Sequence, residues 1–304
     1  MKIPVIVIGG PTASGKTQLA IEWALKLGGE IISCDSRQIY KYMDIGTAKP
    51  TLQERELVPH HLIDIIYPDE VMSAGEFQKL ARRCIEDIYA RGKIPFLVGG
   101  TGLYIRAVIR DIDFPPKVGE NFREMIKEKI RREGLSNVYS ELVEVDPATA
   151  SKISPNDEIR ITRALEVYYA TGKPISFYRR GIDIDYPRYD IVYFVLNPPR
   201  DLLYKRIEER VDKMIQLGLI EETKNILEMG YSPDLPSLQT LGYREIIKYL
   251  QGIYDLESAV EEIKKETRRY AKRQLTWFRN ETRVRLITYE EVEDAFCEIS
   301  RYRK

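Results

Sequence analysis

The chain has 304 residues, of which 47 are Lys or Arg and 47 are Asp or Glu, and 43% of the residues are hydrophobic. At about 150 residues per domain, this length allows two domains with a sizeable core. The net charge of zero argues against a basic surface over the whole molecule and against an acidic disordered tail, but it is compatible with a local basic groove. No apolar run approaches the roughly 18 residues of a membrane span.

The N-terminus and the cysteines indicate a cytoplasmic protein. The opening MKIPVIVIGGPT runs from an apolar segment straight into glycines without a small-residue cleavage site, so we interpret it as a first strand and not as a signal peptide. The three cysteines, Cys34, Cys84 and Cys297, form no CxxC pair, which fits a reducing compartment. The two histidines, His60 and His61, are too few for a structural zinc site, and we assign them no functional role.

The first hundred residues predict a parallel sheet. Apolar runs at 3–9, 30–34 and 94–98 have the length and composition of buried strands. Amphipathic helices are predicted between them, one over 15–27 and one over 73–92 that begins with a Ser-x-x-Glu capping box. Strands that alternate with helices favour an α/β fold with right-handed crossovers.

The pattern changes near residue 117. Residues 117–186 contain helices only, including a charged amphipathic segment from Arg123 to Glu133 and a helix capped by Asn156 that runs to Gly172. A strand returns at 189–196, and helices dominate from there to Glu281. We therefore predict an all-helical insertion domain at 117–186 in a core that consists of residues 1–116 and 187–304.

The segment GPTASGKT matches the GxxxxGK[ST] P-loop, the ATP-binding motif, at every fixed position, with a strand before it and a helix after it. The glycines let backbone N–H groups converge on phosphate oxygens, Lys16 adds a charge, and the Thr17 hydroxyl can hold Mg²⁺. The motif predicts polyphosphate binding without saying which polyphosphate is bound or which group leaves it; the alternative is an ordinary glycine-rich turn. The predicted phosphate-binding residues are Gly10, Pro11, Thr12, Ala13, Ser14, Gly15, Lys16 and Thr17.

A carboxylate is expected beside this loop. Asp35 ends the second strand and Thr101 follows the third, so both should face the crevice that holds Lys16, because ligands of parallel sheets bind at the carboxyl ends of the strands. Asp35 would be a general base or a ligand of Mg²⁺, and the alternative is a turn or cap aspartate. Gln38, close by, has an amide that could form a bidentate contact with adenine.

The C-terminal segment 264–285 is basic and aromatic. It carries nine Lys or Arg against two Glu, with Tyr270, Trp277 and Phe278 among them. Cations suit nucleic-acid phosphates and aromatic rings suit bases, so the segment is a candidate RNA-binding surface. The alternative is an amphipathic helix whose aromatic side chains, with Leu275, pack on the core.

Two further arginines, Arg206 and Arg210, lie four residues apart and so share one face of a predicted helix. One of them could reach the phosphate crevice. Paired with neighbouring glutamates, they could equally form a solvated face.

The sequence resembles the tRNA dimethylallyltransferases, also called tRNA isopentenyltransferases. The resemblance spans nearly the whole chain in the order and spacing of that family. It rests on GPTASGKT (10–17), DSRQIYKYMDIGTAKP (35–50), HHLIDI (60–65), GGTGLY (99–104), NDEIRITRALEV (156–167), TLGYRE (240–245) and RQLTWFRN (273–280).

The resemblance implies transfer of a dimethylallyl group from dimethylallyl diphosphate to N6 of adenosine 37 beside the tRNA anticodon, by a monomer without a membrane partner. It implies a P-loop core with a helical insertion that grips the anticodon stem-loop. Asp35 would be the general base, Thr101 would orient the adenine or the diphosphate, and Lys16, Thr17 and Mg²⁺ would hold the leaving diphosphate. The implied tRNA-binding residues are Asp35, Ser36, Arg37, Gln38, Thr101, Arg123, Ile159, Arg160, Ile161, Thr162, Arg163, Thr240, Leu241, Gly242, Tyr243, Arg244, Glu245, Arg273, Gln274, Leu275, Thr276, Trp277, Phe278, Arg279 and Asn280.

Three other functions are compatible with the motifs. A P-loop kinase would use Asp35 as its base but leaves the insertion and the basic segment unexplained. A prenyltransferase of free adenine nucleotides should need neither of these features. A non-catalytic RNA-binding NTPase switch would keep its measured activity when Asp35 is replaced by Ala.

Overall fold

The computed structural model describes residues 2–110, 112–178 and 188–302. The chain divides into two compact units, which we call the core unit (Met1–Ile109 and Pro187–Lys304) and the helical unit (Arg110–Tyr186). The helical unit begins at Arg110 and not at residue 117, because the last core helix before it ends at Ile109. The second expected boundary falls within 179–187, outside the described residues.

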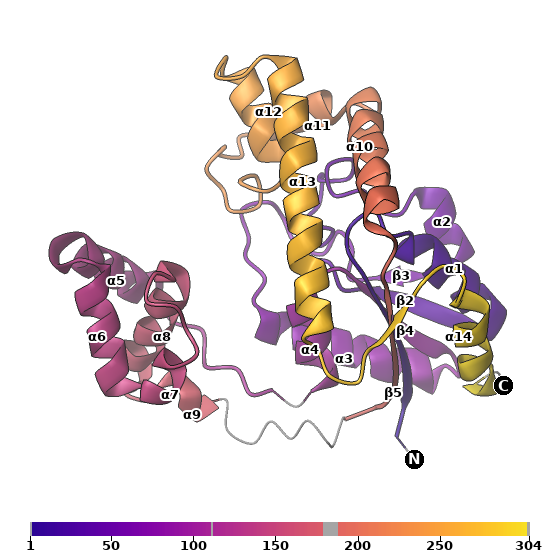
Figure 1. Cartoon of the computed structure of the whole chain (residues 1–304), viewed down its shortest axis with the longest axis horizontal. Coiled ribbons are helices and arrows are strands. Elements are labelled where there is room, and N and C mark those ends of the chain that lie inside the picture. Colours follow the sequence, from indigo (N-terminus) through magenta and orange to yellow (C-terminus); the bar gives the residue numbers. More distant parts are fainter. Residues whose placement is uncertain (1, 111, 179–187, 303–304) are drawn as a thin grey trace. The chain divides into compact units, whose positions relative to one another are not determined.

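The core unit is built on a six-stranded sheet in the order β3-β2-β4-β1-β5-β6, with every neighbouring pair parallel (Figure 1). The predicted α/β P-loop fold with a helical insertion is confirmed. Two strands were not predicted, β3 and β6, because each is only two or three residues long and carries no apolar run. The strands are β1 (Pro4–Gly9), β2 (Gly29–Ser33), β3 (His60–His61), β4 (Ile94–Gly99), β5 (Asp190–Leu196) and β6 (Arg285–Ile287).

Helices cover both faces of the sheet, which is why its strands are apolar on both sides. Helices α1 (Lys16–Leu27) and α14 (Val292–Ile299) pack on one face with Ile6 and Ile8 of β1. Helices α3 (Ala74–Ala90) and α4 (Gly102–Ile109) pack on the other face with Val5 and Val7. Successive side chains of a strand point to opposite faces, so one apolar strand contributes to both layers.

Local signals in the sequence set the ends of these helices. The Ser73 hydroxyl accepts a hydrogen bond from the Glu76 backbone N–H (3.1 Å), and the Glu76 carboxylate accepts one from the Ser73 N–H (2.9 Å), so the predicted capping box at the start of α3 is confirmed. Gly28 ends α1 in the left-handed conformation, with φ of 65°.

Four helices extend beyond the carboxyl ends of the strands, and the last of them runs back beside the sheet to α4 (Figure 1). Together with the segment that follows β2, they form a separate apolar cluster. This cluster includes Met43, Leu238 and Ile263. The predicted basic helix ends at Arg279 and does not continue to residue 285, since Arg285 already belongs to β6. The four are α10 (Arg200–Gln216), α11 (Leu219–Glu228), α12 (Tyr243–Leu250) and α13 (Leu256–Arg279); a short α2 (Leu52–Leu57) precedes β3, and a 3-10 turn, η1 (Ser300–Tyr302), follows α14.

The helical unit has its own core, in which Ile126, Val138 and Leu165 are fully buried. The helix predicted to start at Asn156 is capped instead by Asp157, whose carboxylate accepts a hydrogen bond from the Arg160 N–H (3.1 Å). An aspartate and an asparagine are equally good caps, so residue type alone does not choose between adjacent positions. The helices are α5 (Glu120–Glu133), α6 (Leu135–Val145), α7 (Pro147–Ala150), α8 (Glu158–Thr171) and α9 (Ile175–Tyr178).

Among the described helices of either unit, none combines the length and the apolar character that crossing a membrane requires.

Candidate active site

A cavity of about 420 Å³ opens in the core unit where the P-loop, the segment after β2 and helices α10 and α13 meet. This position, at the carboxyl ends of parallel strands, is where the fold class places ligands. Thirteen of the predicted site residues line the cavity: Thr12, Lys16, Thr17, Asp35, Ser36, Arg37, Gln38, Thr240, Leu241, Gly242, Arg244, Arg273 and Gln274.

The P-loop turns tightly before α1. Gly15 has a φ of 81°, a left-handed conformation that glycine adopts without strain, and α1 begins at the next residue, Lys16. The helix therefore directs its first backbone N–H groups and its positive dipole end at the loop, which is the geometry of an anion site. The Ser14 hydroxyl beside it is buried and has no hydrogen-bond partner among the described residues.

Lys16 is held in the cavity with its ammonium donating to the Pro11 carbonyl (3.3 Å). Burial lowers the pKa of Lys16 from 10.5 to about 8; the negative charge of Asp35 opposes this shift, and the positive charge of Arg210 adds to it. An anionic ligand in this cavity would thus stabilise the charged form of Lys16.

Asp35 has the turn role that the sequence left open, and its role as a general base or Mg²⁺ ligand stays a prediction. Its Oδ1 accepts hydrogen bonds from the backbone N–H groups of Arg37 (2.8 Å) and Gln38 (3.4 Å), which fixes the carboxylate at the start of a turn. Asp35 also lines the cavity. No hydrogen bond to its Oδ2 is found within the described part of the chain, so this oxygen is available to a ligand.

Thr101, which was expected to face the crevice, does not line the cavity. Its hydroxyl instead accepts a hydrogen bond from the Ser36 N–H (3.0 Å), and its own N–H donates to the Cys34 carbonyl (3.1 Å). The residue therefore ties the turn after β4 to the segment that carries Asp35. The order of residues in the chain does not distinguish a side chain that lines the cavity from one that only contacts a lining residue such as Ser36.

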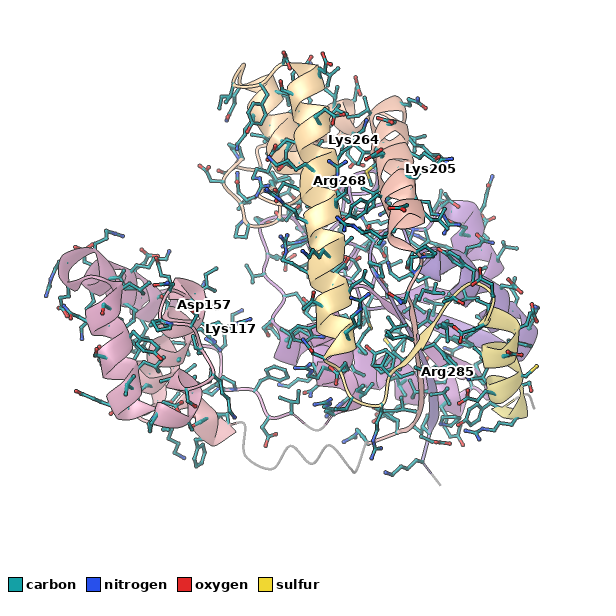
Figure 2. The ribbon with its side chains drawn as sticks, in the orientation of Figure 1. Lys117, Asp157, Lys205, Lys264, Arg268 and Arg285 are labelled. Carbon is teal, nitrogen blue, oxygen red and sulfur yellow. The ribbon has the colours of Figure 1, made fainter. Side chains whose placement is uncertain are left out.

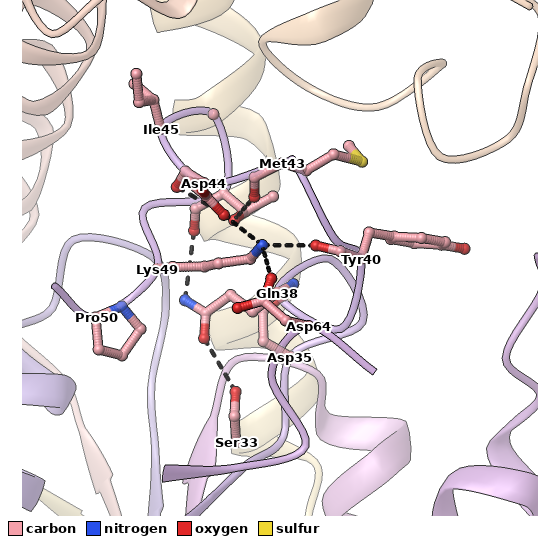
Figure 3. A network of polar contacts seen from close by, with 12 residues as sticks. Ser33, Asp35, Gln38, Tyr40, Met43, Asp44, Ile45, Lys49, Pro50 and Asp64 are labelled. Carbon is pink, nitrogen blue, oxygen red and sulfur yellow. Dashed lines mark hydrogen bonds and ion pairs between the residues drawn. The ribbon is translucent and has the colours of Figure 1, made fainter. Parts of the chain in front are cut away.

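Gln38 is predicted to contact adenine, but both ends of its amide are engaged within the protein. Ser33 Oγ donates to Gln38 Oε1 (3.0 Å), as Figure 3 shows, and Gln38 Nε2 donates to the Ala48 carbonyl (3.1 Å). A bidentate contact with a base would have to replace these bonds. In this structure Gln38 connects the end of β2 to the segment at residues 47–48.

A buried lysine fixes the same segment. Lys49 Nζ donates to the Tyr40 carbonyl (2.6 Å) and forms ion pairs with Asp44 (2.6 Å) and Asp64 (2.5 Å), shown in Figure 3. A buried charge is stable only when it is paired, and these contacts satisfy all three donors of the ammonium. The segment between β2 and α2 is therefore ordered by polar contacts, although it has no regular secondary structure.

The structure separates the two arginines of α10. Arg210 lines the cavity, and its charge acts on both Lys16 and Asp35. Arg206 instead lies over the Tyr289 ring, 4.7 Å from its centroid, and donates to the Tyr289 hydroxyl, which in turn donates to the Ser14 carbonyl (2.8 Å). Arg210 is thus the cation available to a ligand, and Arg206 supports the P-loop from outside.

Several predicted tRNA contacts are buried instead. Phe278 packs at the start of the P-loop, since a Cβ on Gly9 would lie 3.0 Å from its ring. Glu245 closes the start of α12 by accepting from the Gly242 N–H (2.9 Å). These buried side chains support the fold, and their contact with tRNA stays a prediction. The buried members are Ile161, Thr162, Thr240, Gly242, Tyr243, Glu245, Gln274 and Phe278, of which Thr240, Gly242 and Gln274 also line the cavity; Leu275 and Trp277 are partly buried.

Other predicted contacts lie on surfaces. In the helical unit, Ile159 is 83% exposed, which suits contact with a partner. Arg123 and Arg163 both pair with the buried Glu166, Arg123 at 3.2 Å, so these two arginines are held in place by an internal carboxylate. The predicted contacts in the core unit that are exposed are Arg273, Thr276, Arg279 and Asn280.

The positive charge of α13 is partly compensated by neighbours. Lys264 pairs with Asp212 of α10 at 2.8 Å, and Arg268 pairs with Glu208 of the same helix at 2.7 Å; Figure 2 labels both cations on α13. The net positive charge counted from the sequence of α13 is therefore larger than the charge that its surroundings leave uncompensated, because acidic side chains of α10 lie beside it.

The sequence analysis missed some walls of the cavity. Residues Ile263, Thr267 and Tyr270 of α13 line it, as do Val211 and Met214 of α10. The spacing of residues 263, 267, 270 and 274 is that of one helix face, and this period could have identified the wall of α13. Burial raises the pKa of Tyr270 to about 12, so its hydroxyl is neutral at physiological pH.

The family model described as IPP transferase matches residues 38–281. The chain belongs to this family. The chain is 51% identical over 283 residues to a protein of Thermoanaerobacter sp. (strain X514) named tRNA dimethylallyltransferase, a match that covers 92% of this chain and 90% of the relative. The resemblance inferred from the motifs is confirmed.

Two solved structures agree with this family. One is the full-length tRNA isopentenylpyrophosphate transferase of Bacillus halodurans, with 41% identity and a TM-score of 0.71, a match covering 99% of this chain and 97% of that one. The other is a eukaryotic dimethylallyltransferase acting on tRNA, with 32% identity and a TM-score of 0.80, covering 98% of this chain and 78% of that one.

Proposed function

We propose that this protein transfers a dimethylallyl group from dimethylallyl diphosphate to N6 of adenosine 37 in the tRNA anticodon loop and releases diphosphate. As a member of this family the chain is a prenyltransferase, and tRNA is the substrate that its relatives' names give. The observation that carries the detailed proposal is that a P-loop lysine and the Asp35 carboxylate line one cavity.

The leaving diphosphate would be bound by cations and backbone amides. As the allylic C–O bond breaks, negative charge grows on the diphosphate, and Lys16, Arg210 and the first turn of α1 are placed to stabilise it. The chain needs to contact only the phosphate end for this, since the positive charge that develops is delocalised over the allylic carbons.

The residues present fit a magnesium ion bound mainly by substrate. No group of three or more His, Cys, Asp or Glu side chains able to hold a metal is found among the described residues, whereas the Thr17 hydroxyl lines the cavity beside Lys16. Mg²⁺ typically takes one or two protein oxygens, phosphate oxygens and several waters. When bound, it would neutralise charge on the diphosphate.

Asp35 would serve as the general base. The N6 amine of adenine is a weak nucleophile, and removal of one of its protons as the new C–N bond forms makes attack easier. The proton passes to the carboxylate, the C–O bond to the diphosphate breaks, and the positive charge on nitrogen is discharged in the same step. Anchoring of Oδ1 by two backbone N–H groups leaves the orientation of Oδ2 fixed for this role.

The target adenine would have to leave the stack of the anticodon loop to enter the cavity, at a cost of a few kcal/mol. Contacts of basic side chains with stem phosphates would offset that cost. We infer that the helical unit and the exposed residues at the end of α13 bind the anticodon stem-loop. We also expect the protein to act as a monomer in the cytoplasm.

The test is incubation of the protein with unmodified tRNA, Mg²⁺ and dimethylallyl diphosphate, followed by mass analysis of the tRNA nucleosides. The proposal predicts a dimethylallyl adduct on one adenosine, at position 37. Modification of free AMP as fast as of tRNA would favour a prenyltransferase of free nucleotides. Transfer of phosphate from ATP with no adduct would favour a kinase, and in both cases the proposal would be wrong.

A further inference from the structure

The side chain of Gln274, in α13, bridges two loops of the cavity. Its Oε1 accepts a hydrogen bond from the Thr12 backbone N–H of the P-loop (2.9 Å). Its Nε2 donates to the Gly100 carbonyl, in the turn after β4 (2.9 Å). The first partner offers only a donor and the second only an acceptor, so the amide has one permitted orientation. Gln274 is 7% exposed.

Two glycines of the GGTG turn allow α13 to lie this close. A Cβ on Gly100 would lie 2.3 Å from Gln274 Nε2, and a Cβ on Gly102 would lie 2.1 Å from the Trp277 ring. Neither glycine has a positive φ, so close approach, and not backbone conformation, explains the residue type here. The turn therefore packs closely against α13 at two positions, Gly100 against Gln274 and Gly102 against Trp277.

The contacts continue from Gly100 to the proposed base. The next residue, Thr101, accepts a hydrogen bond from the Ser36 N–H (3.0 Å), and Ser36 follows Asp35 directly. Gln274 therefore joins the loop that would hold the diphosphate to the turn after β4, and through Thr101 of this turn to the segment that carries the carboxylate.

We propose that Gln274 is a positioning residue that sets the diphosphate loop relative to the segment of the general base, and that it is not a contact to tRNA. The inference rests on the proposed function, because it assigns Gln274 a role in the same reaction. A shift of about 1 Å between reacting groups can lower a rate by about a hundredfold. A residue that acts through geometry should then affect turnover and not the affinity for tRNA.

The first test replaces Gln274 by Ala and measures steady-state kinetics with both substrates varied. The expected result is a kcat lower by about 10- to 100-fold, with the KM for tRNA within about twofold of the wild type. Gln274→Met, which keeps the side-chain volume, serves if the Ala variant does not fold. Gln53→Ala, at an exposed glutamine of α2, is the matched control and should leave both constants unchanged.

The second test uses Gly100→Ala, alone and combined with Gln274→Ala. The added methyl group would displace the Gln274 amide, so Gly100→Ala should reproduce the kinetic defect of Gln274→Ala. In the double variant the methyl group no longer meets the amide, and kcat should be that of Gln274→Ala alone. Independent structural damage at the two sites would instead multiply the two defects.

An active wild type whose Gln274→Ala variant shows a raised KM for tRNA and an unchanged kcat would overturn the inference and leave the proposed function standing. Multiplied defects in the double variant would overturn it as well. A folded wild type that forms no prenyl adduct would instead defeat the proposed function, and with it this inference.

Discussion

The Asp35 side chain orders a turn with one oxygen and also lines the cavity. Its Oδ1 orders the turn after β2 by accepting from two backbone N–H groups, and its position in the cavity leaves Oδ2 for a substrate. The sequence offered these as alternatives. They are compatible because a carboxylate has two oxygens, each able to accept more than one hydrogen bond.

The lowered pKa of Lys16 predicts how the affinity for dimethylallyl diphosphate changes with pH. Burial holds its pKa at about 8, below the value of 10.5 for an exposed lysine, so the free enzyme loses this charge as the pH rises above about 8. Dimethylallyl diphosphate would bind the protonated form, so binding takes up a proton and its affinity should fall by up to about tenfold per pH unit above 8. Calorimetric titrations between about pH 7 and 9.5 check this.

The matched variant is Lys16→Met, which keeps the length of the side chain without its charge. Its affinity for dimethylallyl diphosphate should be weak at every pH and should not change across that range. A wild-type affinity that stays constant from pH 7 to 9.5 would show that Lys16 does not hold the diphosphate.

Some of the site residues could be predicted from the sequence, and others could not. The P-loop and Asp35 could be predicted because strand ends and motif spacing are local features of the chain. The structural role of Gln274 could not, because its two partners lie 262 and 174 residues away. For Gln274, only the resemblance to the family implied a role, that of a contact to tRNA.

At the scale of elements, a carboxylate of α11 binds the backbone of residues 44–46, in the segment between β2 and α2. Glu222 accepts hydrogen bonds from the backbone N–H groups of Asp44 (3.0 Å), Ile45 (2.8 Å) and Gly46 (3.1 Å), and from the Tyr243 hydroxyl (2.6 Å). These contacts join the segment, of which Gly46 lines the cavity, to α11 and α12.

Replacing Glu222 by Gln should destabilise the protein by about 2 kcal/mol, because hydrogen bonds to a charged acceptor are lost and an amide donor would face backbone N–H groups. Denaturant unfolding measures the change. Glu221→Gln is the control, since Glu221 is the exposed neighbour in the same turn, and its effect should stay within about 0.5 kcal/mol. Equal effects of the two variants would contradict this role of Glu222.

The main strands and most of the helices could be predicted, since each has an apolar pattern of the right period or a cap. What the sequence did not indicate depends on distant neighbours. β6 exists because Arg285–Ile287 pairs with β5, which lies about 90 residues earlier in the chain. The segment between β2 and α2 is ordered by the buried Lys49 and by Glu222, and neither contact follows from local spacing.

For the whole molecule, zero net charge and RNA binding are compatible when the free cations are concentrated. On α13, Lys264 and Arg268 pair with acids of α10, whereas no ion pair is found for the exposed Arg273 among the described residues, and this arginine lines the cavity. Lys272 and Arg279 of the same helix likewise have no ion pair among the described residues, but of these three cations only Arg273 lines the cavity.

Arg273→Glu should accordingly weaken tRNA binding and reduce the slope of log affinity against log salt by about 1. Lys265→Ala, on the same helix, removes a cation already paired with Glu262 (2.8 Å) and should change the slope little. Filter binding or fluorescence anisotropy at several salt concentrations measures both. Equal slopes for Arg273→Glu and the wild type would show that this arginine does not contact phosphate.

The central claim is that a diphosphate cradle and a proton-accepting carboxylate share one cavity, and its most direct test is the single-turnover rate of Asp35→Asn with saturating tRNA and dimethylallyl diphosphate. Asparagine can keep the Oδ1 hydrogen bonds of the turn but cannot accept the N6 proton. We predict a rate lower by about 10²- to 10⁴-fold with tRNA affinity retained. A variant that transfers the prenyl group at the wild-type rate would contradict the account.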